Sequence, residues 1–179
     1  MNTSEANKAL VGILIGSDTD YPVMSEAGTV LEKFGIAYEM EVVSAHRTPA
    51  RAHEYATTAA SRGLKVLIAA AGVAAHLAGV IAANTTLPVI GVPMGAGGLN
   101  GLDALLATVQ MPGGIPVATM AIGKAGAVNA AIFAAEILGT SDPNVARKLV
   151  AHKEELARAV TEKNQRLQEQ LAAKHPIKV

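Results

Sequence analysis

The sequence has 179 residues, a formal net charge of zero and no cysteine. The missing cysteines exclude disulfides, thiolate catalysis and cysteine-ligated zinc, and the balanced charge gives no sign of nucleic-acid binding. The polar first residues lack a signal-peptide core, and the apolar runs stay below the roughly 18 residues of a membrane span. We therefore expect a cytoplasmic protein with no membrane segment.

Short apolar runs alternate with helical segments over the first 139 residues. The runs predicted as strands are 10–15, 37–43, 66–71, 89–92 and 117–122. The segments predicted as helices are 24–34, 50–62, an alanine-rich stretch ending near 83, 102–109 and 128–138. Gly35 and Gly63 are stop signals for two helices, and Pro93 is expected to end the fourth strand.

Continuous apolar strands separated by helices predict an α/β fold, because such strands are buried on both faces. The expected architecture is a three-layer αβα sandwich with a central parallel sheet, flavodoxin-like or Rossmann-like. A long C-terminal helix is expected to follow it. The whole chain, 1–179, is expected to be one domain with its core at 9–139.

The pattern becomes polar after Gly139, and a helix is expected over 142–173. The apolar positions of this helix form a thin stripe: Val145, Leu149, Leu156, Val160, Leu167 and Leu171. The helix lies either on its own core or on a neighbouring subunit. We favour the neighbouring subunit, because the five-strand unit is complete without this helix.

Polar and glycine-rich residues gather after the strands, at 17–20, 44–47, 72–77 and 95–100. The connections at the opposite strand ends are plain, as at 62–65. Because ligands bind beyond the carboxyl ends of parallel strands, the sequence predicts a site at that edge of the sheet.

The segment after the second strand contains the most informative residues. His46 and Arg47 follow a β-branched run directly, and Thr48 and Pro49 are suited to cap and begin a helix. An imidazole and a guanidinium at an electropositive helix start indicate anion binding and proton transfer. The plainer alternatives are a surface histidine and a solvated arginine.

The segment 16–20 is a candidate cradle for a phosphate and a sugar. Ser17 and Thr19 supply hydroxyls, and Asp20 can accept from ribose hydroxyls, although an ordinary capped helix start remains the alternative.

His76 is either a structural histidine or a ligand contact. No group of histidines and carboxylates has convincing metal-ligand spacing.

Four motifs in order resemble one family closely: Gly-Ser-x-x-Asp at 16–20, Ser-Ala-His-Arg-Thr-Pro at 44–49, Ala-Ala-His-Leu at 74–77 and Val-Gln-Met-Pro-Gly-Gly at 109–114. The family is N5-carboxyaminoimidazole ribonucleotide mutase, the class I form of the catalytic subunit of phosphoribosylaminoimidazole carboxylase. The resemblance extends from about Val11 to Leu138.

The resemblance implies an isomerase of de novo purine (IMP) biosynthesis. A carboxylate would move from N5 to ring carbon C4 of a ribonucleotide by decarboxylation and recarboxylation in a closed site, with no metal or organic cofactor. It implies His46 as the acid/base, and Ser17, Asp20 and Arg47 as substrate-binding residues. It also implies further pocket-lining residues: Thr19, Ser44, Gly72, Ala74, Ala75, His76 and Leu77. A homo-octamer is implied as well.

One departure from the family pattern bears on the site. Val73 stands where the family usually has glycine, so a positive φ would strain the valine, and its side chain would narrow the carbon dioxide pocket.

Two other functions stay open: class II carboxylation with free carbon dioxide, and a non-catalytic nucleotide-binding module. Arg47 and the loop 74–76 resemble class I.

Overall fold

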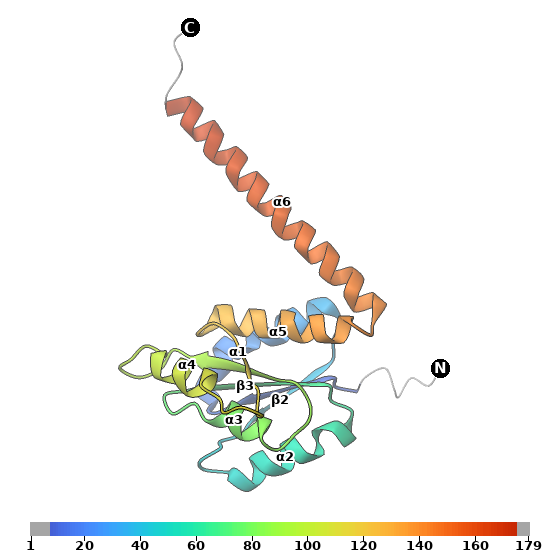
Figure 1. Ribbon diagram of the computed structural model, residues 1–179. Coiled ribbons are helices and arrows are strands. Elements are labelled where there is room, and N and C mark those ends of the chain that lie inside the picture. The colour runs from blue at the N-terminus through green and yellow to red at the C-terminus, as the bar shows by residue number, and fades with distance from the viewer. Residues whose placement is uncertain (1–7, 175–179) are drawn as a thin grey trace.

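A single parallel sheet organises the computed structural model, which describes residues 8–174 (Figure 1). Its strands are β1 (Val11–Ile15), β2 (Tyr38–Val42), β3 (Val66–Gly72), β4 (Val89–Met94) and β5 (Ala118–Thr119). The helices are η1 (Asp18–Asp20), α1 (Tyr21–Phe34), α2 (Pro49–Arg62), α3 (Leu77–Ala82), α4 (Leu102–Val109), α5 (Lys124–Gly139) and α6 (Pro143–Lys174). The strand order β2-β1-β3-β4-β5 is the flavodoxin-like order, which confirms the predicted fold class.

Helices cover both faces of the sheet (Figure 1). Helices α1 and α5 pack on one face, over Ile13, Ile68 and Ile90. Helices α2 and α3 pack on the other face, over the side chains of Leu14 and Leu67. All five residues of β1 are buried, which explains why its sequence reads as a continuous apolar run.

The predicted helix ends are confirmed where glycine sets them. Gly35 and Gly63 have φ of +72° and +104°, and they follow α1 and α2 directly. Their backbone N–H groups donate to carbonyls of the last turn, as expected for a left-handed cap. Helices α1 and α2 therefore end where the sequence indicates.

Two expectations at the β4 side of the sheet are wrong. Pro93 does not end β4, which continues to Met94, and β5 covers only Ala118–Thr119 instead of 117–122. The two differences have one cause. The Pro93 carbonyl faces β5 and accepts from the Gly123 N–H at 2.9 Å, so the missing proline N–H lies on the same side. A longer β5 would need a hydrogen bond from the backbone nitrogen of Pro93, which proline cannot donate. Because β5 is short, Pro93 can stay inside β4 without losing such a bond.

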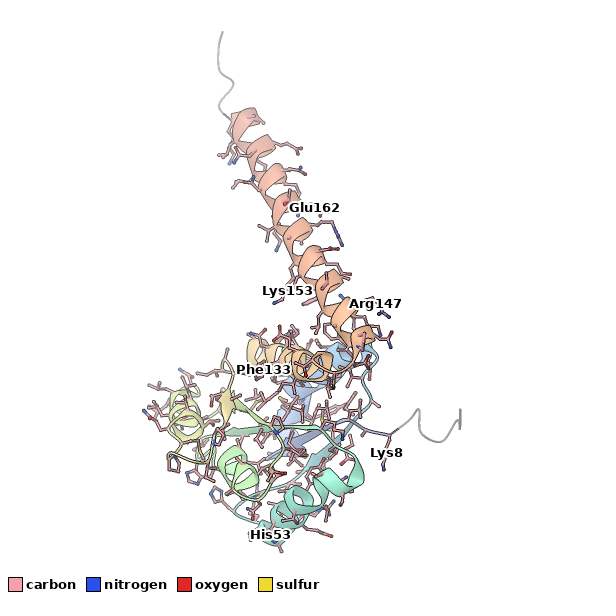
Figure 2. The ribbon with its side chains drawn as sticks, turned by 45° about the vertical axis from the view of Figure 1, so that its right-hand side comes forward. Lys8, His53, Phe133, Arg147, Lys153 and Glu162 are labelled. Carbon is pink, nitrogen blue, oxygen red and sulfur yellow. The ribbon has the colours of Figure 1, made fainter. Side chains whose placement is uncertain are left out.

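Helix α6 leaves the body of the molecule after its first turns (Figures 1 and 2). Val145 is buried, Leu149 packs against the core, and the Lys148 Nζ donates to the Phe34 carbonyl at 2.7 Å. Beyond these first turns the apolar side chains of α6 are exposed: Leu156, Val160, Leu167 and Leu171. Among residues 8–174, α6 and the other helices lack the combination of length and apolar character that crossing a membrane requires.

Candidate functional site

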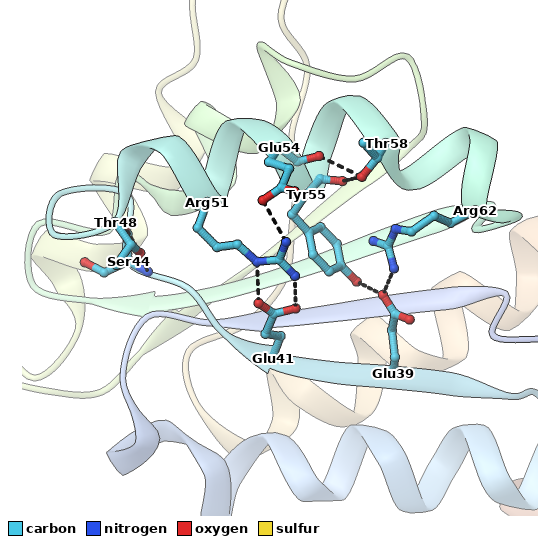
Figure 3. A network of polar contacts seen from close by, with 9 residues as sticks. All are labelled: Glu39, Glu41, Ser44, Thr48, Arg51, Glu54, Tyr55, Thr58 and Arg62. Atoms are coloured by element: carbon cyan, nitrogen blue, oxygen red, sulfur yellow. Dashed lines mark hydrogen bonds and ion pairs between the residues drawn. The ribbon is translucent and has the colours of Figure 1, made fainter.

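Helix α2 is clamped onto β2, and the loop that carries His46 joins these two elements (Figure 3). The Arg51 Nε and Nη2 donate to the two carboxylate oxygens of Glu41 at 2.6 and 2.7 Å. Arg51 also donates to Glu54 at 2.9 Å, within α2. A two-point arginine–carboxylate contact fixes orientation as well as distance, so the start of α2 is held in register with the end of β2.

A second contact holds the other end of α2 (Figure 3). The buried Tyr55 donates its hydroxyl proton to Glu39 at 2.7 Å, and Arg62 donates to the same carboxylate. Burial raises the pKa of Tyr55, and its hydrogen bond to Glu39 raises it further. Burial also acts to raise the pKa of Glu39, but hydrogen bonds from Tyr55 and Arg62 outweigh it and hold that pKa below its usual range.

The loop between β2 and α2 is closed by its own side chains. The Thr48 hydroxyl accepts from the Ser44 N–H and donates to the Ser44 carbonyl, both at 3.0 Å. Thr48 is at the N-cap position of α2, but its hydroxyl bonds to Ser44 and makes no capping hydrogen bond to the helix. The predicted capping contact is therefore wrong. The Ser44 Oγ accepts from the Arg47 backbone N–H at 3.1 Å, so Ser44 and Thr48 together set the direction of the segment that carries His46.

A second loop follows β1 and starts α1. The Ser17 Oγ accepts from the Thr19 N–H at 3.3 Å and from the Thr19 hydroxyl at 2.9 Å, which caps η1. Asp20 is 9% exposed, and its burial raises the pKa of the carboxyl, with the nearby Asp18 adding a smaller effect in the same direction. A hydrogen bond with the backbone of Ser17 acts in the opposite direction and lowers the pKa of Asp20. A buried carboxylate that has lost part of its hydration is stabilised by a ligand that donates hydrogen bonds to it.

The end of β3 and the loops after β1, β2, β3 and β4 line one cavity of about 260 Å³. It is lined by Gly16, Ser17, Thr19, Asp20, Ser44, Ala45, His46, Arg47, Ala71, Gly72, Val73, Ala74, Leu77 and Ala96. The predicted residues in this lining are Ser17, Thr19, Asp20, Ser44, His46, Arg47, Gly72, Ala74 and Leu77. The cavity lies at the carboxyl ends of the strands, where the sequence places a site.

His76 lies beside the cavity and contacts its histidine. The His46 Nε2 lies 2.9 Å from the His76 Nδ1, with the rings inclined at 76°. Between two neutral imidazoles this hydrogen bond needs a proton on one of the facing nitrogens and a lone pair on the other. Ala75, which was expected to line the pocket, is 1% exposed and is not part of the cavity wall.

Val73 has the positive φ that would strain it. Its φ is +55°, and its side chain is 51% exposed and lines the cavity. Asn100 is the other residue between 8 and 174 that has positive φ without being glycine. Asparagine tolerates this conformation much better than a β-branched residue, so Val73 is the true backbone outlier.

Sequence reasoning did not single out the alanines that complete the cavity. Ala45, Ala71 and Ala96 line it but carry no reactive group, whereas Gly16, which also lines it, belongs to the predicted cradle at 16–20. Only their position after a strand could have indicated them. Across residues 8–174, His, Cys, Asp and Glu side chains form no group of three or more that could hold a metal ion.

Comparison with known proteins identifies the family of this chain. Residues 10–159 match the family described as AIR carboxylase. The chain is 55% identical to N5-carboxyaminoimidazole ribonucleotide mutase of Pyrococcus horikoshii, over 92% of both chains. It is also 55% identical to the enzyme of the same name from Bacillus subtilis, over 88% of this chain and 98% of the relative.

A solved structure supports the same assignment. The crystal structure of Treponema denticola PurE superposes with a TM-score of 0.80 at 27% identity, covering 89% of this chain and 98% of that one. The match therefore covers most of the length of both chains. The chain belongs to the AIR carboxylase family.

Proposed function

We propose that this chain is an isomerase of de novo purine biosynthesis that converts N5-carboxyaminoimidazole ribonucleotide into 4-carboxyaminoimidazole ribonucleotide. The observation that carries the proposal is a single cavity in which His46 lies among hydroxyl, carboxylate and guanidinium side chains. Relatives that are 55% identical and bear the name of this mutase support the same reaction.

The proposed reaction has two steps that balance in protons. First the bond between N5 and the carboxylate breaks, its electron pair stays on N5, and His46 supplies the proton that N5 takes up. Then C4 attacks the released carbon dioxide, and the neutral His46 takes the proton that C4 loses. One imidazole serves both steps, and a positioned acid/base of this kind contributes about 10²–10⁴-fold in rate.

The polar residues of the cavity are assigned to the ribonucleotide. Arg47 binds the phosphate, because a guanidinium donates two parallel hydrogen bonds to phosphate oxygens. Asp20 accepts hydrogen bonds from ribose hydroxyls, and Ser17, Thr19 and Ser44 supply hydroxyls around them. Gly72, Ala74 and Leu77 form the apolar wall, Ala75 supports this loop from the core, and His76 contacts His46.

We propose that the enzyme assembles from several copies, as a homo-octamer, with the C-terminal helix of each copy on a neighbour. The stripe on α6 repeats every eleven residues: Val145 and Leu149, Leu156 and Val160, Leu167 and Leu171. An eleven-residue repeat keeps a stripe almost parallel to the helix axis. Its first pair packs on the body of the same chain, whereas the outer pairs are exposed. A second copy would bury the same stripe farther out, in a cytoplasmic assembly.

The test is to offer both candidate substrates separately. With N5-carboxyaminoimidazole ribonucleotide, the carboxylated product should form without added bicarbonate. With aminoimidazole ribonucleotide and carbon dioxide, formation should be much slower. The reverse preference would assign the class II reaction. Binding of the ribonucleotide without turnover of either substrate would leave a non-catalytic nucleotide-binding module.

A further inference from the structure

The segment that carries His46 and Arg47 has few side chains in the core. Val43 is fully buried before it, and Ala52 is fully buried after it. Residues 44–51, which lie between them, contain no buried side chain. Core packing therefore fixes the two ends of this segment, and polar contacts set its course between them.

Strand β2, which leads into this segment, offers α2 no hydrophobic surface. Side chains alternate along a strand, and Tyr38 and Met40 pack on the face of the sheet that α1 and α5 cover. The side of β2 that faces α2 therefore carries Glu39 and Glu41 (Figure 3). The buried side chains of α2 pack with residues of β1 and β3 instead. Helix α2 is thus held to β2 by hydrogen bonds and ion pairs.

The ion pair nearest the segment has the more specific geometry. Arg51, in the first turn of α2, donates to both carboxylate oxygens of Glu41 at 2.6 and 2.7 Å, and Glu54 extends the network at 2.9 Å. A single exposed ion pair stabilises little, whereas a two-point arginine–carboxylate contact within a network fixes the geometry of its partners. His46 lies midway between Glu41 and Arg51 in the sequence. The contact therefore fixes how far apart the two ends of the segment lie.

We propose that Arg51 is a positioning residue for the proposed reaction: its two-point contact with β2 sets where the segment places His46 and Arg47 in the cavity. The inference rests on the proposed function. Arg51 is not part of the cavity wall, so it acts only through the segment. Its loss should disturb both the proton transfer assigned to His46 and the phosphate binding assigned to Arg47.

Steady-state kinetics with the carbamate substrate, together with thermal unfolding of each variant, test the inference. The variants are Arg51→Ala, Arg51→Lys, Glu41→Gln, and Arg51→Ala combined with Glu41→Gln. The matched controls are Arg62→Ala and Arg62→Lys, because Arg62 joins the far end of α2 to Glu39 of the same strand. A loss of folded enzyme lowers kcat in proportion and leaves KM unchanged, whereas a displaced segment lowers kcat and raises KM.

Arg51→Ala should lower kcat and raise KM, with a loss in kcat/KM of at least about tenfold, because a displacement near 1 Å can cost about a hundredfold in rate. Glu41→Gln leaves one acceptor and should show a smaller loss in the same direction. The double variant should lose no more than Arg51→Ala alone, since both changes remove one contact. Arg51→Lys keeps the charge without the two-point contact and should recover only part of the loss. The Arg62 variants should lower the melting temperature and keep the wild-type kcat and KM.

Wild-type kcat and KM in Arg51→Ala would overturn the inference alone. An additive loss in the double variant would also overturn it, as would a loss in the Arg62 variants equal to that in the Arg51 variants. If Arg51→Ala does not fold, Arg51→Lys and Glu41→Gln, compared with Arg62→Lys, decide the matter. A wild-type enzyme that forms no product from the carbamate would overturn the proposed function and the inference with it.

Discussion

Replacing His76 by alanine should slow the chemical step without weakening substrate binding. The His76 Nδ1 lies 2.9 Å from the His46 Nε2, with ring centroids 5.0 Å apart, so this contact holds the orientation of the His46 ring. A neutral hydrogen bond contributes about 0.5–1.5 kcal/mol. If that energy is lost in the transition state, kcat falls by about two- to tenfold, since 1.36 kcal/mol corresponds to tenfold in rate.

Steady-state kinetics with the carbamate substrate separate kcat from KM. His76→Asn keeps a polar atom close to the position of the imidazole Nδ1, and it should recover part of the loss. His53→Ala is the matched control, because His53 also holds a hydrogen bond, 2.8 Å to the Asn84 Oδ1, but lies outside the cavity. His76 has no such positioning role if His76→Ala keeps the wild-type kcat, or if asparagine restores no more activity than alanine.

Three further perturbations test the roles of Arg47, Asp20 and helix α6. Arg47→Ala should raise KM by about ten- to a hundredfold with less change in kcat, because a charge-assisted hydrogen bond contributes about 1.5–3 kcal/mol; an unchanged KM would contradict phosphate binding by Arg47. Asp20→Asn should raise the melting temperature at pH 7, because burial, which raises the pKa of Asp20, penalises its charged form in the folded state. The gain should shrink as the pH falls and the wild-type carboxyl takes up its proton, so a gain that grows toward acid would contradict this cause. Leu156→Asp combined with Val160→Asp should dissociate the assembly in sedimentation experiments, and a wild-type monomer at the same concentration would rule out the proposed contact.

The fold was accessible from the sequence where one local rule acts alone. The apolar run of β1 and the glycines at 35 and 63 each have a direct physical meaning, and the structure agrees with them. Pro93 was misread because its effect depends on which neighbouring strand faces its nitrogen. That information lies in the sheet and not in the residues around the proline.

The site was accessible where reactive side chains follow strand ends. His46, Arg47 and Asp20 meet in one cavity because the carboxyl ends of parallel strands share an edge. The contact between His46 and His76 joins residues thirty positions apart, and no local pattern contains it. The clamp that Arg51 makes with Glu41 was missed for the same reason, since its partners belong to different elements.

The most direct test of proton transfer by His46 is the turnover of His46→Asn with N5-carboxyaminoimidazole ribonucleotide. Asparagine is polar and similar in size but cannot take up a proton at neutral pH. We expect the variant to bind the ribonucleotide with little change in affinity and its turnover to fall by about 10²–10⁴-fold. Turnover close to that of the wild-type enzyme would contradict the assignment of proton transfer to His46.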